Sequence, residues 1–413
     1  MLEVLAPVGL LAIVYLRPLT LLIAALLIVV VLSYRQTIHA YPQGGGAYIV
    51  AKDNFGTIPG LVAAMALLID YVLTVAVSAS AGVSAIVSAM PALASARLWL
   101  AVACVGLITW GNLRGVRQSG RLFAAPTYSF IGSIGVLLLV GCWRAVTGEM
   151  AAHAPLASGE AGIGISGFLL LRAFANGCTA MTGVEAISNG IPAFEPPEPD
   201  NAAATLVTMA GILVTMFVGI NLLAVGPGVL PHESETVLSQ LGRAIFGGRT
   251  APYYFLQITT TAILILAANT SYADFPRLVS ILARDRFAPA LFARRSDRLT
   301  FSNGIGLLTL LSVTLIIAAR GRELGLIPLY AIGVFLSFTL SQAGMVRHWW
   351  RHPVRGWKWR AAMNAAGTMA TTVVLIVFLV AKFREGAWVV VILIPAGVWV
   401  LLTVSRHYST GPS

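Results

Sequence analysis

The stretch that decides the fold is ALLIDYVLTVAVS, from Ala66 to Ser78, which lies inside an apolar run over residues 60–88. A helix that crosses a lipid bilayer needs about 20 consecutive apolar residues, and this run exceeds that length. One carboxylate, Asp70, interrupts it. A charged side chain at this depth costs about 2.5–3.5 kcal/mol on insertion scales, so it usually faces a cavity, a partner charge or a transported ion.

Eleven more apolar runs surround this stretch. The whole chain of 413 residues is 58% hydrophobic and only 10% charged, with a mean hydropathy of +0.85. A soluble domain carries about 25% charged residues, so the composition excludes a soluble globule, a disordered chain and a disulfide scaffold. Backbone groups in lipid must be hydrogen-bonded within their own segment, and runs this long and continuous are typical of helices rather than barrel strands. We predict an all-α polytopic membrane protein whose other runs cover residues 4–16, 19–33, 98–112, 123–143, 166–190, 202–224, 253–269, 304–319, 326–346, 361–381 and 387–405.

The basic residues predict the orientation. The net charge is +11, and most Lys and Arg residues fall in alternate connections, which should therefore be cytoplasmic. This pattern is typical of a plasma-membrane protein and does not indicate nucleic-acid binding. The expected partners are the lipid bilayer and a small cation or amino-acid substrate, with a homodimer as the candidate assembly.

Residues 1–16 and the segments near the basic connections need separate interpretation. Residues 4–16 rise only about 20 Å as a helix, against a hydrocarbon core of about 30 Å. With Arg17 placed outside, we interpret residues 1–16 as the outer half of a first span, followed by about eleven full spans. Residues 269–286 are amphipathic and basic, which favours an interfacial helix on the cytoplasmic face. Residues 406–413 are expected to form a short cytoplasmic tail.

Polar side chains form a column around Asp70. Asp70, Thr74 and Ser78 follow i, i+4, i+8 spacing and share one helix face, with Tyr71 close to the stripe. One carboxylate and two hydroxyls offer oxygen ligands that suit a monovalent cation or a proton. Alternatively, Thr and Ser bond their own i−4 carbonyls and Asp70 pairs with a structural partner. We favour the functional interpretation because no basic residue is near Asp70 on its helix.

A second buried carboxylate, Glu185, follows the sequence NGCTAMTGV, residues 176–184. Gly177 and Gly183 bracket the hydroxyls of Thr179 and Thr182, and glycine costs about 1 kcal/mol in a helix interior. A broken helix is predicted, since transporters bind substrates and ions where such helices expose backbone groups. Close helix packing through small residues is the alternative, but it does not account for Glu185.

Other motifs point away from enzymes and cofactors. The loop Tyr41-Pro42-Gln43-Gly44-Gly45-Gly46 permits close backbone approach, but no Gly-Lys-Ser/Thr follows, so packing under the bundle is favoured over phosphate binding. The six histidines lie in connections with no nucleophile pattern, and the three cysteines form no metal-ligand cluster. We therefore expect no enzyme activity and no cofactor, with ions as the transported species.

Three stretches resemble the amino acid–polyamine–organocation (APC) superfamily, and most closely its KimA/Kup-type potassium uptake branch. They are residues 33–48 (SYRQTIHAYPQGGGAY), 177–190 (GCTAMTGVEAISNG) and 268–277 (ANTSYADFPR). The resemblance covers nearly the whole chain. It implies a LeuT-like inverted-repeat bundle over residues 1–405, with repeats over roughly 1–143 and 166–346 and two extra helices over 361–405. It also implies that Asp70, Thr182 and Ser78 carry potassium or its coupling proton, and that Glu185 is a proton-linked or gating carboxylate.

The function expected from residues and resemblance together is proton-coupled potassium uptake. Two mid-membrane carboxylates and a hydroxyl column favour a cation. An amino-acid permease of the same superfamily is the alternative, and a non-transporting fragment is a third possibility. Family members begin with an inner half of the first helix, so we expect the native start to lie about 40–50 residues upstream, by analogy with broken-helix transporters.

Overall fold

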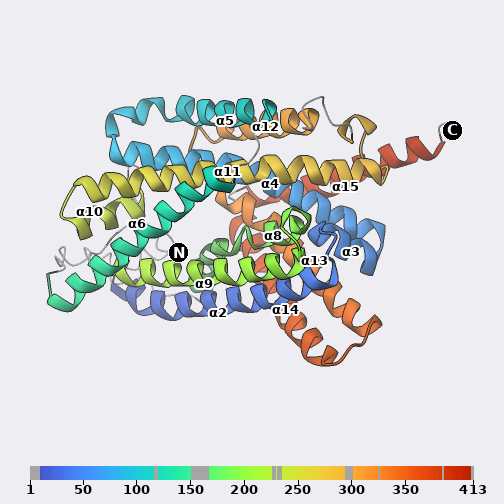
Figure 1. Cartoon of the computed structure of the whole chain (residues 1–413), viewed down its shortest axis with the longest axis horizontal. Coiled ribbons are helices and arrows are strands. Elements are labelled where there is room, and N and C mark those ends of the chain that lie inside the picture. Colours follow the sequence, from blue (N-terminus) through green and yellow to red (C-terminus); the bar gives the residue numbers. More distant parts are fainter. Residues whose placement is uncertain are drawn as a thin grey trace.

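The computed structural model describes residues 10–115, 120–149, 167–225, 229, 235–293, 301–323, 326–383 and 386–410. Every regular element in these ranges is a helix, which confirms the predicted all-α class. The helices lie side by side in one bundle (Figure 1). They are α2 (Leu10–Ala40), α3 (Gly46–Phe55), α4 (Thr57–Ala89), α5 (Arg97–Leu113), α6 (Gly120–Thr147), α7 (Gly167–Cys178), α8 (Val184–Asn189), α9 (Glu198–Val225), α10 (Val237–Phe246), α11 (Ala251–Arg284), α12 (Ser302–Ala318), α13 (Ile327–Arg351), α14 (Trp357–Lys382) and α15 (Ala387–Thr410).

Nine helices in the described ranges are long and apolar enough to cross a membrane, and α12 is a shorter apolar helix. Their burial separates an interior from a lipid-facing shell. The most apolar stretch of α4 is 67% buried and that of α13 is 61% buried, whereas the corresponding stretches of α5, α6 and α9 are each 17% buried. Large apolar side chains such as Leu107 on α5, Leu139 on α6 and Leu222 on α9 are exposed, as expected of surfaces that contact lipid tails. The interior helices α4 and α13 are therefore the ones that can carry a shielded site.

Among the described residues, two large apolar clusters of the core meet at α4. One joins α4 to α5, α11 and α12, and the other joins α2, α9, α13 and α14. In Figure 1, α5 and α12 form one edge of the bundle and α2 and α9 the opposite edge, with α4 and α11 between them. The short helices α3 and α10 lie at opposite ends of the bundle (Figure 1). Residues of α4 thus contact helices of both clusters.

The start of the chain differs from the prediction. A turn was predicted at Arg17, between runs 4–16 and 19–33, but α2 runs without interruption from Leu10 to Ala40 and contains Pro18. Proline is tolerated within membrane helices because neighbouring groups satisfy the freed carbonyl, and Arg17 is exposed, so its long side chain needs no turn. Residues 1–9 of the predicted half-span lie outside the described residues.

The interfacial helix predicted at residues 269–286 was also wrong. These residues continue α11, which packs against α4 along the bundle. Ser271, Tyr272, Phe275 and Leu278 are all buried there, so this face of the segment packs against other helices rather than facing water. At the other end of the chain, α15 extends to Thr410, into the segment predicted as a tail.

Candidate functional site

The first wall of the candidate site is the middle of α4. Asp70 is only 2% exposed, and its Oδ1 atom has no hydrogen-bond partner. Helix α13 approaches it closely through Gly333, where an added Cβ atom would lie 2.8 Å from the Ala66 carbonyl oxygen and 3.6 Å from the Asp70 Cβ. A buried carboxylate oxygen without a partner is costly, so this geometry favours occupation by a proton or a cation.

The second wall is the broken helix predicted around Gly183, and the structure confirms the break. Helix α7 ends at Cys178, a short 3₁₀ turn covers Thr179–Met181, and Thr182 is extended. Gly183 has φ +93°, a left-handed conformation that glycine adopts without strain, and α8 begins at the next residue. At the break the regular helical ladder is interrupted, and the Gly183 N–H bonds to the Glu185 side chain instead of a carbonyl one turn earlier.

Side chains at the break turn toward its backbone. Both carboxylate oxygens of Glu185, which is 3% exposed, accept from the Gly183 N–H at 3.2 Å. The Thr182 hydroxyl donates to the Thr179 carbonyl at 2.9 Å, and the Thr179 hydroxyl donates to the Asn176 carbonyl at 2.7 Å. Each hydroxyl thereby keeps its oxygen lone pairs available as ligands.

Tyr330 of α13 joins the two walls. Its hydroxyl lies beside the side chains of Thr74 and Thr182, and it is within electrostatic range of Asp70 and Glu185. The sequence reasoning missed this residue because only the fold brings α13 against both α4 and the break. A signal was present, since Tyr330 and Gly333 are three residues apart and share one helix face.

The structure places the other predicted residues as follows. Ser78 lies one turn beyond Thr74 on α4 and is 9% exposed. The Tyr71 hydroxyl points instead to the end of α8, where it accepts from Asn189 Nδ2 at 2.7 Å. Asp70, Thr74, Thr182 and Glu185 are thus gathered at Tyr330, while Thr179 lies at the entry to the break.

Charge is unbalanced at this site. Asp70 and Glu185 are within electrostatic range of each other in a buried environment. Two carboxylates that share a desolvated site cannot both carry a charge without strong mutual repulsion. A cation or a proton held between them removes that repulsion.

A polar cluster closes the end of the bundle predicted to be cytoplasmic. The Tyr48 hydroxyl and the Lys52 ammonium both donate to Asp285, at 2.5 Å and 2.6 Å, and this links α3 to the end of α11. Burial, together with the hydrogen bond to the Asp285 carboxylate, raises the pKa of Tyr48 well above its ordinary value. The Gly-rich loop lies nearby, with Gly44 and Gly46 against Asn189, so the predicted packing role agrees with its contacts.

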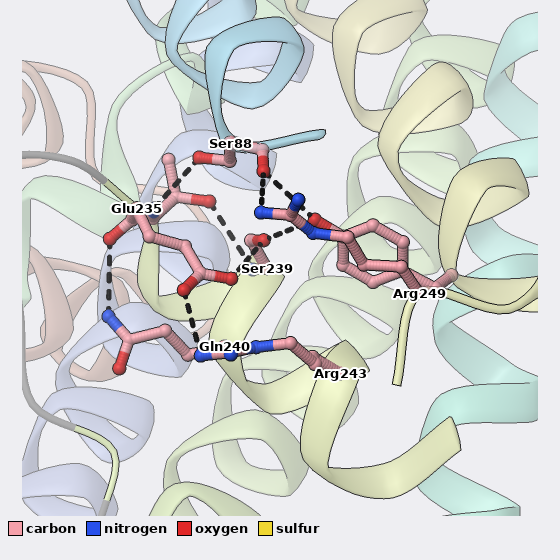
Figure 2. Close-up of polar contacts among 8 residues, drawn as sticks. Ser88, Glu235, Ser239, Gln240, Arg243 and Arg249 are labelled. Carbon is pink, nitrogen blue, oxygen red and sulfur yellow. Dashed lines mark hydrogen bonds and ion pairs between the residues drawn. The ribbon is translucent and has the colours of Figure 1, made fainter. Parts of the chain in front are cut away.

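A second polar cluster closes the opposite end, around the last turn of α4 (Figure 2). The Ser88 hydroxyl accepts from the Thr236 N–H at 3.0 Å, and the Ser88 carbonyl accepts from Arg249 and from Tyr253, each at 3.2 Å. An ion pair between Arg243 and Glu235 lies beside it, at 2.9 Å. The cluster fixes α10 and the start of α11 over the end of α4.

Two comparisons with known proteins identify the family of this chain. The sequence profile of the amino acid permease family matches residues 4–403. The chain is 46% identical over 409 residues to the potassium transporter KimA of Bacillus subtilis (strain 168), a match that covers 98% of this chain and 67% of that protein. Both matches cover the interior helices and the break described above. The chain therefore belongs to the amino acid permease family of the APC superfamily and is a multi-pass membrane protein of that family.

Proposed function

We propose that this protein is a secondary active transporter that takes up potassium together with protons. The observation that carries the proposal is the meeting of Asp70, Thr74, Thr182 and Glu185 at Tyr330, between an interior helix and a broken one. Hydroxyl and carboxylate oxygens at such a break replace the water shell of a monovalent cation. The 46% identity to a potassium transporter supports potassium as that cation.

We propose a LeuT-like inverted repeat as the frame of the site. Helices α2 to α6 contain 31, 10, 33, 17 and 28 residues, and helices α9 to α13 contain 28, 10, 34, 17 and 25 residues. Corresponding helices pack on each other, α2 on α9, α4 on α11 and α5 on α12. In this frame the broken segment α7–α8 and the short helix α12 count as spans beside the nine longer ones, which gives eleven crossings.

The residues divide into two roles in this proposal. Asp70, Thr74, Ser78 and Thr182 supply oxygens to potassium, with the hydroxyl of Tyr330 as a ligand from α13. Glu185 carries the coupling proton. Its two hydrogen bonds from the Gly183 N–H hold the carboxylate at the break, so a change in its protonation alters contacts at the hinge between α7 and α8.

Growth of a potassium-uptake-deficient host at limiting potassium tests the proposal. The chain should restore growth, Asp70→Asn should abolish it, and Asp53→Asn should leave it intact because Asp53 is exposed on α3. Purified protein in vesicles should take up radioactive rubidium, and excess potassium should compete with it while amino acids should not. Competition by amino acids but not by potassium would establish the amino-acid permease instead.

A further inference from the structure

A small cavity lies beside the candidate ion site, on the side of the Gly-rich loop. Gly45, Tyr71, Asn189, Asp274 and Arg277 contribute to its lining, and it has room for about one water molecule. Two of these residues adjoin the candidate site along their helices, since Tyr71 follows Asp70 on α4 and Asn189 lies on α8, which also contains Glu185; a 2.7 Å hydrogen bond joins the two. Gly45 connects the cavity to the loop at the end predicted to be cytoplasmic. The cavity therefore lies between the buried carboxylates and the cytoplasmic surface.

The lining is polar enough to hold that water. Asn189 is 7% exposed, and its Oδ1 atom has no hydrogen-bond partner. The Asp274 carboxylate and the Tyr71 hydroxyl add acceptors, and the Arg277 guanidinium adds donors. A buried water usually makes about three hydrogen bonds to such groups, so the cavity meets the requirements for an ordered internal water.

Asp274 is a third carboxylate near the site, on a helix that the ion-site proposal does not use. It is within electrostatic range of Tyr71, Asp70 and Glu185. Asp70 follows the start of α4 by about 20 Å of helix rise, and Asp274 precedes the end of α11 by about 15 Å. Because those two helix ends lie on the same side of the bundle, joined through α3 by the Lys52–Asp285 ion pair, Asp274 is about one turn nearer the cytoplasm.

The charge of Arg277 decides what this cavity can carry. Arg277 lies beside Asp274 and offsets its negative charge. A fixed guanidinium disfavours a resident cation, but it does not hinder a neutral water or the transfer of a proton. The groups facing Asp274 are Asp70 and Tyr71 from α4, Glu185 and Asn189 from α8, and Arg277 from α11 itself.

We propose that Asp274, Asn189 and Arg277 form a proton-release station that passes the coupling proton from the ion site to the cytoplasm. The inference rests on the proposed function. A proton leaves Glu185 for the water in the cavity, and that water gives up one of its own protons to the Asp274 carboxylate. The proton then leaves Asp274 for the cytoplasm, which restores the starting state. Potassium does not pass through this station.

Transport by the full chain in phospholipid vesicles tests the station, because it separates coupling from ion movement. An acidic exterior should drive potassium accumulation by the unaltered protein, while rubidium–potassium exchange at equal pH measures ion movement alone. Asp274→Asn should lower accumulation roughly tenfold or more, since proton transfer by a positioned group contributes at least that factor, and should leave exchange within about twofold. Asp274→Glu should restore part of the accumulation, and Asp53→Asn is the matched control on the exposed face of α3.

Each other result has a definite meaning. Unchanged accumulation in Asp274→Asn would overturn the station, and so would equal loss of accumulation and exchange in a folded variant. If Asp274→Asn does not fold, Asn189→Ala serves instead, and accumulation equal to that of the unaltered protein would overturn the proposal. Absence of any exchange by the unaltered protein would refute the proposed potassium transport, whereas exchange that ignores the pH gradient would refute the proton coupling and this station with it.

Discussion

Replacement of Gly333 by alanine tests whether α13 forms a wall of the ion site. The added Cβ would lie 2.8 Å from the Ala66 carbonyl oxygen, against about 3.3–3.6 Å for an ordinary carbon–oxygen contact. The obstacle is backbone of α4, which cannot rotate away, so α13 must move by roughly 0.5–0.8 Å. That displacement moves Tyr330 relative to Asp70, and binding sites tolerate only about 0.5 Å of such error.

The expected magnitude follows from two opposing terms. Overpacking of a tight contact costs about 1–3 kcal/mol, and Gly→Ala in a helix returns up to about 1 kcal/mol. We expect Gly333→Ala to lower the free energy of unfolding by about 1–2 kcal/mol and to weaken ion affinity about tenfold. The matched control is Gly306→Ala on α12, where an added Cβ meets nothing within 4 Å and only the helix-propensity gain remains.

Rubidium uptake kinetics and ion-dependent thermal unfolding in detergent measure the two effects. The half-saturating concentration should rise in Gly333→Ala, while Gly306→Ala should match the unaltered protein. An unchanged half-saturating concentration in a destabilised Gly333→Ala would refute the placement of α13 at the site, since the helix would then have moved without disturbing any ligand.

Three further predictions concern the clusters that hold the bundle. The fully buried side chain of Asn364 accepts a hydrogen bond from Ser33 at 2.5 Å and donates one to Gln36 at 2.9 Å. Asn364→Ala should therefore lower the free energy of unfolding by about 2–3 kcal/mol, measured by thermal unfolding. An effect below about 0.5 kcal/mol would contradict the role of this network. Tyr253→Phe removes two hydrogen bonds, one to the Ser88 carbonyl and one with the Ser239 hydroxyl, and should cost about 1–3 kcal/mol in the same assay, with uptake preserved. The pKa of Tyr48 is raised in the folded state, so the unfolded chain ionises this tyrosine first as the pH increases. The free energy of unfolding should therefore fall as pH rises above about 10, and Tyr48→Phe should make that fall less steep. The same dependence on pH in Tyr48→Phe and in the unaltered protein would contradict this reasoning.

The candidate site was predictable where local chemistry decides the outcome. Gly183 and the hydroxyls beside it predicted the break, because glycine and hydroxyl residues weaken a helix wherever they occur. Asp70 and Glu185 were identified because a carboxylate within an apolar run has few structural uses. Tyr330 and Asp274 were not predicted, since a tyrosine and an acidic residue near arginines are ordinary at helix ends. Only the packing of α13 and α11 against α4 gives those two residues a role.

The errors share one physical cause. Arg17 was taken as evidence of a turn, and the arginines of residues 269–286 as evidence of an interfacial helix, because charge was assumed to mark the membrane boundary. A long cationic side chain can lie along apolar surface while its head reaches polar groups, so the helix axis need not end where the charge begins. Arg277 illustrates the consequence. It lies within α11 beside Asp274, although its charge suggested an interfacial segment. In the proposed mechanism, that same charge excludes a cation from the cavity, so that only a proton passes through it.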